Sequence, residues 1–287
     1  MNILILGCGY VGMKVGQSLA NAGHQVWGLR RSPHEKLGME RIGIHPLIGD
    51  LAHPEHWQRS LDTIDAIVNA TSSKAGGADG YRSLYLDGTR VILDWALEWP
   101  LRSYVHIGST SVYGQTDGEW VDEDSLTAPA NETSRILLET EKLLLAAGRE
   151  RGTPVTLLRS AGIYGPERGH LFQQFLKGEA RITGDGLRWL NMIHRDDLAA
   201  AVERCILSPG IGRVLNVCDD EPCTERRFFE WLAEKTGRPL PTPMDPSERV
   251  RKRGATNKRI SNHKLKHTLG LALTYPSFRQ GYEALLT

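Results

Sequence analysis

Several features that would place a chain in a special class of protein are absent from this sequence. Its 35 basic residues are balanced by 34 acidic ones, so no charge excess favours a nucleic acid or an anionic membrane. The apolar run at the N-terminus is too short to span a membrane, and no basic region or cleavage site marks an export signal. We therefore expect a cytoplasmic protein that acts on a small-molecule substrate, with no nucleic acid and no membrane as partner.

Cysteine is also scarce. The four cysteines, Cys8, Cys205, Cys218 and Cys223, form neither a CxxC pair nor a metal-ligand pattern with histidine. We expect reduced, structural thiols and no metal site. The rest of the composition is ordinary, since 40% of the 287 residues are hydrophobic, which is enough to bury a full core. The locally basic stretch 248–259 is interpreted as a solvated loop.

Short apolar runs rich in Val, Ile and Leu alternate with segments of helical period. We expect strands within residues 2–6, 25–29, 45–49, 65–70, 103–108 and 155–159, and helices within 11–22, 54–61, 81–98 and 132–150. This alternation predicts an α/β fold, a Rossmann-type doubly wound parallel sheet of about seven strands that is covered on both faces.

The pattern changes after residue 165, where Gly, Pro and Arg become frequent. A helix and a strand resume within about 190–218. We therefore predict a Rossmann dinucleotide-binding domain over residues 1–165 that is completed by about 190–218. A smaller C-terminal substrate lobe is expected from residues 166–189 and 219–287.

The most specific local signal is the glycine pattern in "ILILGCGYVG", which lies between an expected strand and an expected helix. Gly7 permits a tight turn, Gly9 lets a pyrophosphate approach the backbone, and Gly12 lets the helix pack closely on the strand. The phosphates would then lie at the positive end of the helix. In this context the pattern predicts a dinucleotide-binding site; the alternative is a tight turn without a ligand.

The end of the second expected strand bears on which dinucleotide is bound. An NAD site usually has Asp or Glu there to bind the ribose hydroxyls, whereas this sequence has Arg30, Arg31 and Ser32. Two cations and a hydroxyl suit the 2′-phosphate of NADP. We expect NADP as the cofactor, with NAD as the second choice; the alternative is that the arginines merely point into solvent.

Further cofactor contacts are expected in the loops that follow the strands. Asp50 follows the third strand, where its carboxylate could accept from the adenine amino group or cap the helix expected near Pro54. The remaining expected contacts are Tyr10, Val11, Leu51, Ala70 and Thr71.

The order of these motifs resembles that of one family. The chain resembles the extended short-chain dehydrogenase/reductases, the NAD-dependent epimerase/dehydratase family, through "GCGYVG", "GDL", "GSTSVYG", "LRSAGIYGP", "NMIHRDDLAAAV" and "LNVCDDEPCTERRFFEWLAEKTG" in that order. The resemblance implies a Rossmann domain with a C-terminal substrate lobe, and work on nucleotide sugars or related carbonyl and hydroxyl compounds. It also implies a homodimer as one option, for which the apolar faces of 81–98 and 132–150 could serve.

The resemblance assigns residues to the reaction. In that family a serine or threonine hydroxyl binds the reacting oxygen, and the resemblance assigns this role to Ser109, four residues before Tyr113. A hydroxyl can donate to a carbonyl as hydride moves, although Ser109 could instead satisfy backbone groups at a strand end. Tyr113 could be a packing residue or a phenol that faces the cavity. Ile163 and Tyr164 are implied to lie nearest the nicotinamide.

The chain lacks the usual acid of that family, a Tyr-x-x-x-Lys pair on the next helix whose lysine lowers the pKa of the phenol. No tyrosine lies between Tyr113 and Tyr164, and Lys142 is too far along the helix. Two registers of the helix are open, one with Thr133 and Leu137 at the two positions and one with Asn131 and Arg135 there. Neither pair reproduces the chemistry.

Two functional interpretations follow from this departure. The first is an NAD(P)-dependent oxidoreductase, an NADPH-dependent reductase of a small carbonyl or sugar-like compound, with a degenerate catalytic site that includes Ser109, Tyr113 and Tyr164. His170 is a further titratable candidate, and Thr133 or Ser134 could replace the phenol as a hydrogen-bond donor. The second is a non-catalytic NADP(H)-binding redox sensor or regulatory protein. We favour the enzyme, because positioning supplies much of the reduction in the barrier to hydride transfer.

Later segments are implied to reach the substrate. Asp196 in "HRDDL" is expected to be the N-cap of a helix, while His194 and Arg195 could face the substrate or be structural. The family binds a diphosphate or sugar in the region that corresponds to Arg181, Arg188 and Trp189, which could equally cover the interface between the lobes.

Overall fold

The central feature of the fold is a seven-stranded sheet. The computed structural model describes residues 1–73, 76–96, 99–210, 212–244 and 256–286. Within them the sheet order is β11-β7-β5-β4-β1-β2-β3, with β1 (Asn2–Leu6), β2 (Gln25–Arg30), β3 (Ile44–Ile48), β4 (Ala66–Asn69), β5 (Ser103–Ser109), β7 (Val155–Ser160) and β11 (Arg213–Val217). Every neighbouring pair is parallel, so all these strands end at the same edge. The predicted doubly wound α/β fold is confirmed.

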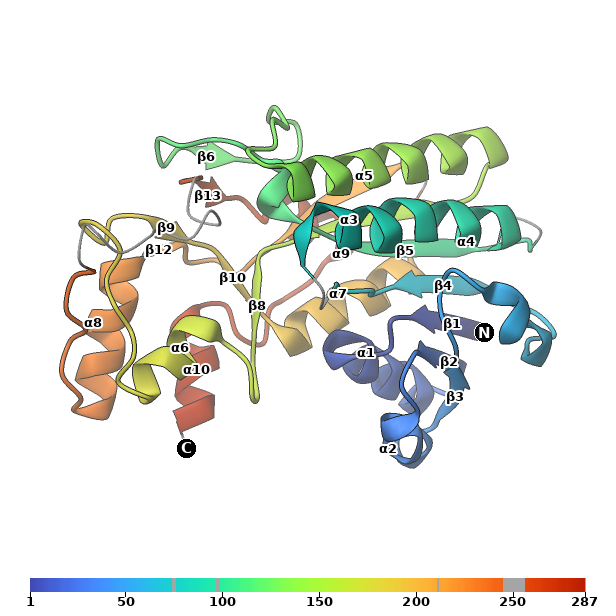
Figure 1. Ribbon diagram of the computed structural model, residues 1–287, viewed down its shortest axis with the longest axis horizontal. Helices are drawn as coiled ribbons and strands as arrows, with labels where there is room; N and C mark the ends of the chain where they lie inside the picture. The colour runs from blue at the N-terminus through green and yellow to red at the C-terminus, as the bar shows by residue number, and fades with distance from the viewer. Residues whose placement is uncertain (74–75, 97–98, 211, 245–255, 287) are drawn as a thin grey trace.

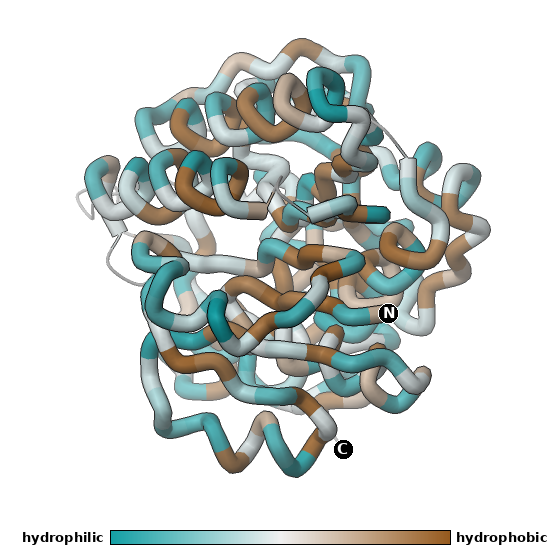
Figure 2. Tube along the Cα trace, turned by 90° about the vertical axis from the view of Figure 1, so that its right-hand side faces the viewer, coloured by the Kyte–Doolittle hydropathy of each residue, from teal (hydrophilic) through white to brown (hydrophobic). Residues whose placement is uncertain are grey.

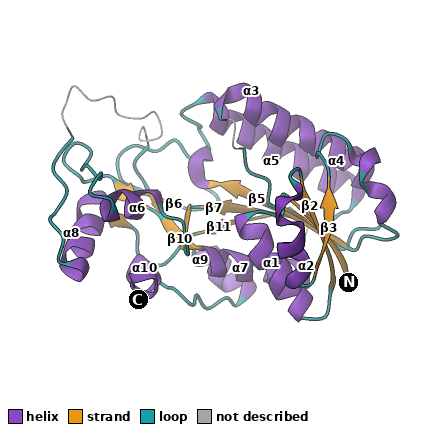
Figure 3. Cartoon of the chain, turned by 60° about the horizontal axis from the view of Figure 1, so that its bottom comes forward, coloured by secondary structure: helices purple, strands orange, loops and turns teal. Residues whose placement is uncertain are grey.

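Helices cover both faces of the sheet (Figure 1, Figure 3). One face carries α1 (Tyr10–Asn21), α2 (Lys36–Arg41), α7 (Arg195–Leu207) and α9 (His263–Leu269). The other carries α3 (Gly77–Tyr81), the π-helical turn η4 (Arg82–Asp87), α4 (Gly88–Ala96) and α5 (Glu132–Arg151). In the described part of the chain, no helix combines the length and the apolar character needed to cross a membrane.

The strands are continuous apolar runs because both of their faces are buried. Ile3 and Ile5 join the core beneath α1 and α7, whereas Leu4 and Leu6 join the core beneath α4. Hydrophobic segments accordingly run through the middle of the molecule (Figure 2). This double burial explains why the sheet could be predicted from short runs of Val, Ile and Leu.

A second, smaller core lies beyond the carboxyl edge of the sheet, to the left in Figure 1. It is built from α6 (His170–Leu176), α8 (Glu225–Thr236), α10 (Phe278–Leu286), β8 (Gly162–Tyr164), β9 (Trp189–Leu190), β10 (Met192–His194) and β12 (Cys223–Thr224). Many of its side chains are aromatic, and the Phe228 ring lies 5.2 Å from Tyr282 and 5.6 Å from Phe278. Two more short strands, β6 (Trp120–Val121) and β13 (Arg259–Ile260), pair with each other. The residue boundaries of the predicted substrate lobe stay a prediction.

The helix predicted at 54–61 is wrong. The structure has two 3₁₀ turns there, η2 (Pro54–His56) and η3 (Gln58–Ser60). The Trp57 side chain between them is buried, and its indole nitrogen donates to the carbonyl oxygen of Asp50 at 2.9 Å. One large buried side chain therefore holds this loop, and the only apolar pair at helical spacing, Trp57 and Leu61, is too short a pattern to specify an α-helix. Between β2 and β3, the 3₁₀ turn η1 (Pro33–Glu35) and the short helix α2 were not predicted.

The four cysteines are buried, free thiols, as predicted. Burial raises the pKa of Cys8 and of Cys205 to about 12, so both thiols are protonated at neutral pH. A buried protonated thiol behaves as a small apolar side chain, which is the structural role expected for these residues.

Helix α5 begins and ends at local signals in the sequence. The side chain of Asn131 accepts a hydrogen bond from the Ser134 backbone at 2.9 Å and caps the first turn. Gly152 ends the helix in the left-handed conformation, with φ of +68°. Ile136 and Leu144 bury one face of the helix against the sheet side of the molecule. The cap at Asn131 and the left-handed Gly152 therefore define where α5 begins and ends.

A buried ion pair joins α5 to the sheet. The Arg159 guanidinium of β7 donates to Glu141 of α5 at 2.8 Å and 3.1 Å. It also donates to the Tyr113 hydroxyl at 2.8 Å, and that hydroxyl donates to Asn216 of β11 at 2.9 Å. Burial raises the pKa of the Glu141 carboxyl, against the opposing effect of Arg159. The pKa of Arg159 is also raised, since Glu141 and Tyr113 outweigh the opposing effect of burial, so the buried guanidinium stays charged. Removing either partner would leave the other buried without its main interaction.

We predict that breaking this pair is costly and that replacing both partners is not. Glu141→Ala leaves the Arg159 charge buried and should lower the free energy of unfolding by about 3–5 kcal/mol, whereas Glu141→Met with Arg159→Met should restore most of it. Urea unfolding at pH 7 measures both values. If Glu141→Ala lowers the free energy of unfolding by less than about 1 kcal/mol, the pair does not anchor α5.

Candidate functional site

One cleft is lined by half of the predicted catalytic and cofactor-binding residues. It has a volume of 990 Å³ and is lined by the glycine loop, the ends of β4, β5 and β7, the start of α5, and residues of the smaller core. The carboxyl edge of a parallel sheet is where ligands bind in folds of this kind. The cleft therefore lies where the topology of the sheet predicts a site.

The glycine loop has the geometry that the sequence predicted. Gly7 has φ of +74°, and a Cβ on it would lie 2.6 Å from the Cα of Thr71. A Cβ on Gly12 would lie 3.0 Å from the Gly7 carbonyl oxygen, so the helix packs closely on the strand. On Gly9 a Cβ would meet only that oxygen, at 3.8 Å, and would project into open space. Of these three glycines, Gly9 is the one whose backbone a ligand can approach.

The N-terminus of α1 fits the anionic part of a dinucleotide. Gly9 is the N-cap and provides no side-chain cap, while Tyr10 and Val11 form the first turn and line the cleft with it. Uncapped N–H groups and the positive end of the helix dipole favour a pyrophosphate at this place. The residues present therefore fit a nicotinamide dinucleotide.

The predicted adenosine end lies on the loops after β2 and β3. Arg31 is exposed and Arg30 is half-buried. The Ser32 hydroxyl caps η1 by accepting from the His34 backbone at 3.4 Å. Both arginines are therefore accessible to a ligand or to solvent. The loop after them ends in the turn η1.

The Asp50 carboxylate does not cap a helix at Pro54, and that alternative is wrong. It accepts from the Ala52 backbone at 3.0 Å, and η2 takes His53 as its N-cap. The second carboxylate oxygen has no partner among the described residues. Leu51 is buried in the core, so its backbone alone could contact a cofactor.

Residues from β5, β8 and the loop after β4 also line the cleft. They are Ala70, Thr71, Ser109 and Ile163, and Thr71 lies against Gly7 of the glycine loop. Ser109 begins the turn η5 (Thr110–Val112), and its Oγ accepts from the Ser111 backbone at 3.1 Å. Because that bond uses a lone pair, the hydroxyl proton of Ser109 remains free to donate.

The start of α5 lines the cleft where the two open registers differ. Thr133 and Leu137 of one register both line the cleft. Of the other register, Asn131 lines it too, whereas Arg135 is exposed and pairs with Glu132 at 2.7 Å. The Thr133 hydroxyl donates to the Asn131 side chain at 2.7 Å, so its proton is already engaged.

Tyr113 lies beneath the cleft rather than in it. Its side chain is fully buried, and its hydroxyl is held between Arg159 and Asn216. Burial also raises the pKa of its phenol. Of the two roles left open by the sequence, the geometry supports packing.

Tyr164 lines the cleft with its ring but not with its hydroxyl. The hydroxyl is packed against Gly281 of α10 and has no hydrogen-bond partner among the described residues. The ring stacks on Tyr282 with centroids 4.3 Å apart. Burial raises the pKa of Tyr164 well above its ordinary value, so this phenol is a poor source of protons.

The predicted N-cap at Asp196 is wrong. α7 begins at Arg195, and the ring of His194 caps it by accepting from the Asp196 backbone at 3.2 Å through Nδ1. Burial lowers the pKa of His194 to about 4, so the ring is neutral and can accept. Asp196 instead pairs with Arg195 at 2.8 Å and with Lys14 at 3.5 Å. The sequence could not rank these neighbouring candidates for the cap.

The remaining candidates divide between the cleft and the surface. His170, Arg188 and Trp189 line the cleft. Arg195 lies over the Tyr10 ring at 5.0 Å and borders the glycine loop. Arg181 is exposed and donates to the Ala180 carbonyl oxygen at 2.9 Å, outside the cleft lining.

Lys258 is a cleft residue that the sequence analysis missed. Its side chain is 6% exposed, and Nζ donates to the Tyr113 carbonyl oxygen at 2.8 Å and to the Thr256 hydroxyl at 3.0 Å. Burial lowers its pKa to about 8. The solvated loop expected at 248–259 is therefore wrong for Lys258, while residues 248–255 lie outside the described residues. No local pattern marks Lys258, because its neighbours are distant in sequence.

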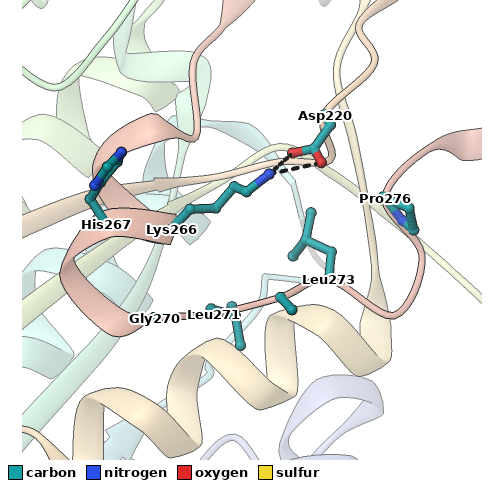
Figure 4. A pocket seen from close by; sticks show the side chains of 8 residues that line it. Asp220, Lys266, His267, Gly270, Leu271, Leu273 and Pro276 are labelled. Carbon is teal, nitrogen blue, oxygen red and sulfur yellow. Dashed lines mark hydrogen bonds and ion pairs between the residues drawn. The ribbon is translucent and has the colours of Figure 1, made fainter.

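A second hollow, of 490 Å³, lies beside α9 and is not the site (Figure 4). Lys266 reaches across it to Asp220 at 2.9 Å, and both charges are thereby satisfied. It shares no lining residue with the glycine-loop cleft. It is therefore separate from the cleft at the glycine loop.

Two curated relatives match most of the chain. Protein YeeZ of Escherichia coli (strain K12) is 26% identical over 283 residues, which cover 96% of each chain. The 2-alkyl-3-oxoalkanoate reductase of Stenotrophomonas maltophilia is 26% identical over 259 residues, which cover 83% of this chain and 77% of that protein.

Solved structures share the fold over nearly the full length. One from Methylobacillus flagellatus, named for an NAD-dependent epimerase/dehydratase, is 32% identical with a TM-score of 0.78, covering 99% of this chain and 97% of that one. The UDP-glucuronic acid 4-epimerase of Bacillus cereus, in complex with UDP-glucuronic acid and NAD, has a TM-score of 0.84 at 22% identity, with coverage of 99% and 97%. At this low identity, the similarity to the Bacillus cereus epimerase is evidence for a shared fold and for nothing further.

The match to a family model is broader than any single motif. It covers residues 3–218, from β1 through the seventh strand of the sheet, and so includes the glycine loop, Ser109 and the start of α5. Together with the geometry of the glycine loop, it makes a nicotinamide dinucleotide the cofactor of this fold. The chain belongs to the NAD dependent epimerase/dehydratase family.

Proposed function

We propose that this protein is an NADPH-dependent reductase of a small carbonyl or sugar-like compound, working without the tyrosine and lysine of its family. The observation that carries the proposal is the Ser109 hydroxyl, which lines the cleft with its proton free to donate. The similarity to a protein named as a 2-alkyl-3-oxoalkanoate reductase supports a carbonyl substrate. The family match supports an enzyme.

The chain's own residues position the carbonyl and polarise it. The bound cofactor would supply a hydride to the carbonyl carbon. Ser109 donates to the carbonyl oxygen and stabilises the negative charge that develops there. A serine hydroxyl is too weak an acid to give up its proton at neutral pH, so the proton comes from water at the start of α5, beside Asn131 and Thr133. The placement of Tyr113 and Tyr164 leaves them out of this step.

The preference for NADPH rests on Arg30, Arg31 and Ser32. No carboxylate stands at the end of β2 to bind ribose hydroxyls, and a 2′-phosphate would find two cations there. NAD remains the competing cofactor, since the epimerase of Bacillus cereus was solved with NAD. The comparison of the two nucleotides therefore decides this part of the proposal.

A second candidate function is a redox sensor that binds NADP(H) without turnover. The apolar Leu137 lines the cleft and stands at the family's lysine position in one of the two open registers. The hydroxyls of the two phenols predicted as catalytic, Tyr113 and Tyr164, are both held away from the cleft. We place this function second, because positioning and one hydrogen bond can still accelerate hydride transfer.

For the cofactor we predict about tenfold tighter binding of NADPH than of NADH, because charge-assisted hydrogen bonds to a phosphate form only with NADPH. Arg30→Ala with Arg31→Ala should remove the preference, and 0.5 M salt should reduce it. Arg149→Ala, at the far end of α5, is the matched control. Equal affinities in the unchanged protein would refute the preference.

For the reaction we predict that Ser109→Ala lowers kcat about 100-fold, because one donor to the developing oxyanion is lost. Tyr113→Phe should lower stability by about 1 kcal/mol through its lost hydrogen bonds and keep kcat close to that of the unchanged protein. NADPH oxidation with a panel of aldehydes, ketones, quinones and keto-sugars measures kcat. Tight NADPH binding with no turnover across the panel would favour the sensor.

A further inference from the structure

The wall of the cleft beside the start of α5 is formed by α3 and η4, which pack against that helix (Figure 1). Tyr81, the last residue of α3, lines the cleft together with Asn131 and Thr133. A guanidinium nitrogen of the next residue, Arg82, lies 3.6 Å from a carboxylate oxygen of Glu132 in the first turn of α5. These contacts hold Tyr81 beside the start of the helix that carries the acid in its family.

The Tyr81 hydroxyl is a proton donor without a partner in the described part of the chain. The side chain is half-buried and packs beside the core cluster that includes Leu137. No hydrogen bond joins the hydroxyl to another described residue, and it is not one of the buried polar atoms. A hydroxyl that is neither buried nor bonded to protein is hydrated. The Tyr81 proton is therefore available to water in the cleft.

Three nearby phenols differ from Tyr81 in this respect. Tyr10 donates to a backbone carbonyl oxygen at 2.9 Å. Tyr85 lies with its ring centroid 5.0 Å from that of Tyr81, but its hydroxyl accepts from the Ser73 backbone at 3.2 Å, and burial raises its pKa. Tyr282 is buried, and burial raises its pKa well above the ordinary value. Each of the three is engaged or buried, whereas the Tyr81 hydroxyl is neither.

Reduction of a carbonyl needs an acid stronger than water. Bulk water has a pKa of ~15.7. A water that gives its proton to the developing alkoxide is therefore left as hydroxide unless a stronger acid restores the proton. A phenol, whose pKa in solution is ~10, is strong enough to do so.

The start of α5 offers a place for such a water. The side-chain oxygen of Asn131 accepts from the Thr133 hydroxyl at 2.7 Å and from the Ser134 backbone at 2.9 Å. The amide nitrogen of Asn131 makes no hydrogen bond to a described residue, and the Thr133 oxygen can still accept one. With the Tyr81 hydroxyl these groups give a water the two to four polar partners that an ordered water uses.

We propose that Tyr81 is the proton source for the water at the start of α5, and so performs the task of the phenol that the family carries on that helix. The inference rests on the proposed function, in which Ser109 holds the carbonyl oxygen. When the carbonyl carbon has accepted hydride, the water gives one proton to the oxygen and takes one from Tyr81. The carbonyl becomes an alcohol and Tyr81 a tyrosinate, which regains its proton from solvent.

The direct test removes the hydroxyl alone. Tyr81→Phe should lower kcat about 100-fold for the best carbonyl compound of the panel, because the acid is lost. KM, NADPH affinity and stability in urea should stay close to those of the unchanged protein, since the hydroxyl makes no described hydrogen bond. Tyr85→Phe, the same change at the neighbouring phenol, is the matched control and should keep kcat. An unchanged kcat in Tyr81→Phe, or an equal loss in both variants, overturns the proposal.

Turnover in deuterium oxide separates a proton source from a residue that only packs. Without its acid, the proton transfer is slower and limits kcat more strongly. The ratio of kcat in H2O to kcat in D2O should therefore be larger in Tyr81→Phe than in the unchanged protein. A fall in kcat with no change in this ratio would make Tyr81 a packing residue and would contradict the proposal.

Ser109→Ala distinguishes failure of this inference from failure of the reductase. Turnover that falls in Ser109→Ala but not in Tyr81→Phe keeps the reductase and excludes Tyr81 as its proton source. Turnover that falls in both variants, with NADPH binding intact, supports both proposals. If the unchanged protein reduces no compound of the panel, the reductase is refuted and the role of Tyr81 with it.

Discussion

The arrangement of the cleft depends on the buried contact between Glu141 of α5 and Arg159 of β7. This ion pair fixes the rotation of α5, so that Thr133 and Leu137 face the cleft and Arg135 faces solvent. The same guanidinium takes up the Tyr113 hydroxyl, which removes that phenol from the cleft. One buried pair therefore anchors the helix whose start lines the cleft and also holds a tyrosine hydroxyl outside the cleft. A buried charge needs a partner, so Arg159 of the sheet holds Glu141 and with it the start of α5 in place beside the cleft.

The proposed function uses two parts of one cleft. The uncapped start of α1 favours the phosphates of a dinucleotide. Ser109, at the end of β5, offers a single polarising hydroxyl. A well-positioned substrate needs less from an acid group, because positioning already reduces the barrier to hydride transfer.

The sequence predicted those parts of the fold that depend on local pattern. The strands follow from runs of apolar residues, and the glycine loop follows from a spacing whose steric reasons hold at Gly7 and Gly12. It could not predict features that depend on distant partners. Lys258 is buried through contacts with Tyr113 and Asn191, which are far from it in the chain. The direction of the Tyr164 hydroxyl depends on Gly281 in the last helix, and the register of α5 depends on Arg159. Between 54 and 61, one buried tryptophan outweighed the weak helical signal.

The most direct test of the central claim is a crystal structure of the protein with NADPH and an unreactive analogue of a carbonyl substrate. The account predicts that Ser109 Oγ lies about 2.6–3.2 Å from the carbonyl oxygen of the analogue, while the Tyr113 hydroxyl stays bonded to Asn216. A carbonyl oxygen bound by a tyrosine hydroxyl, with Ser109 turned away from it, would contradict the account.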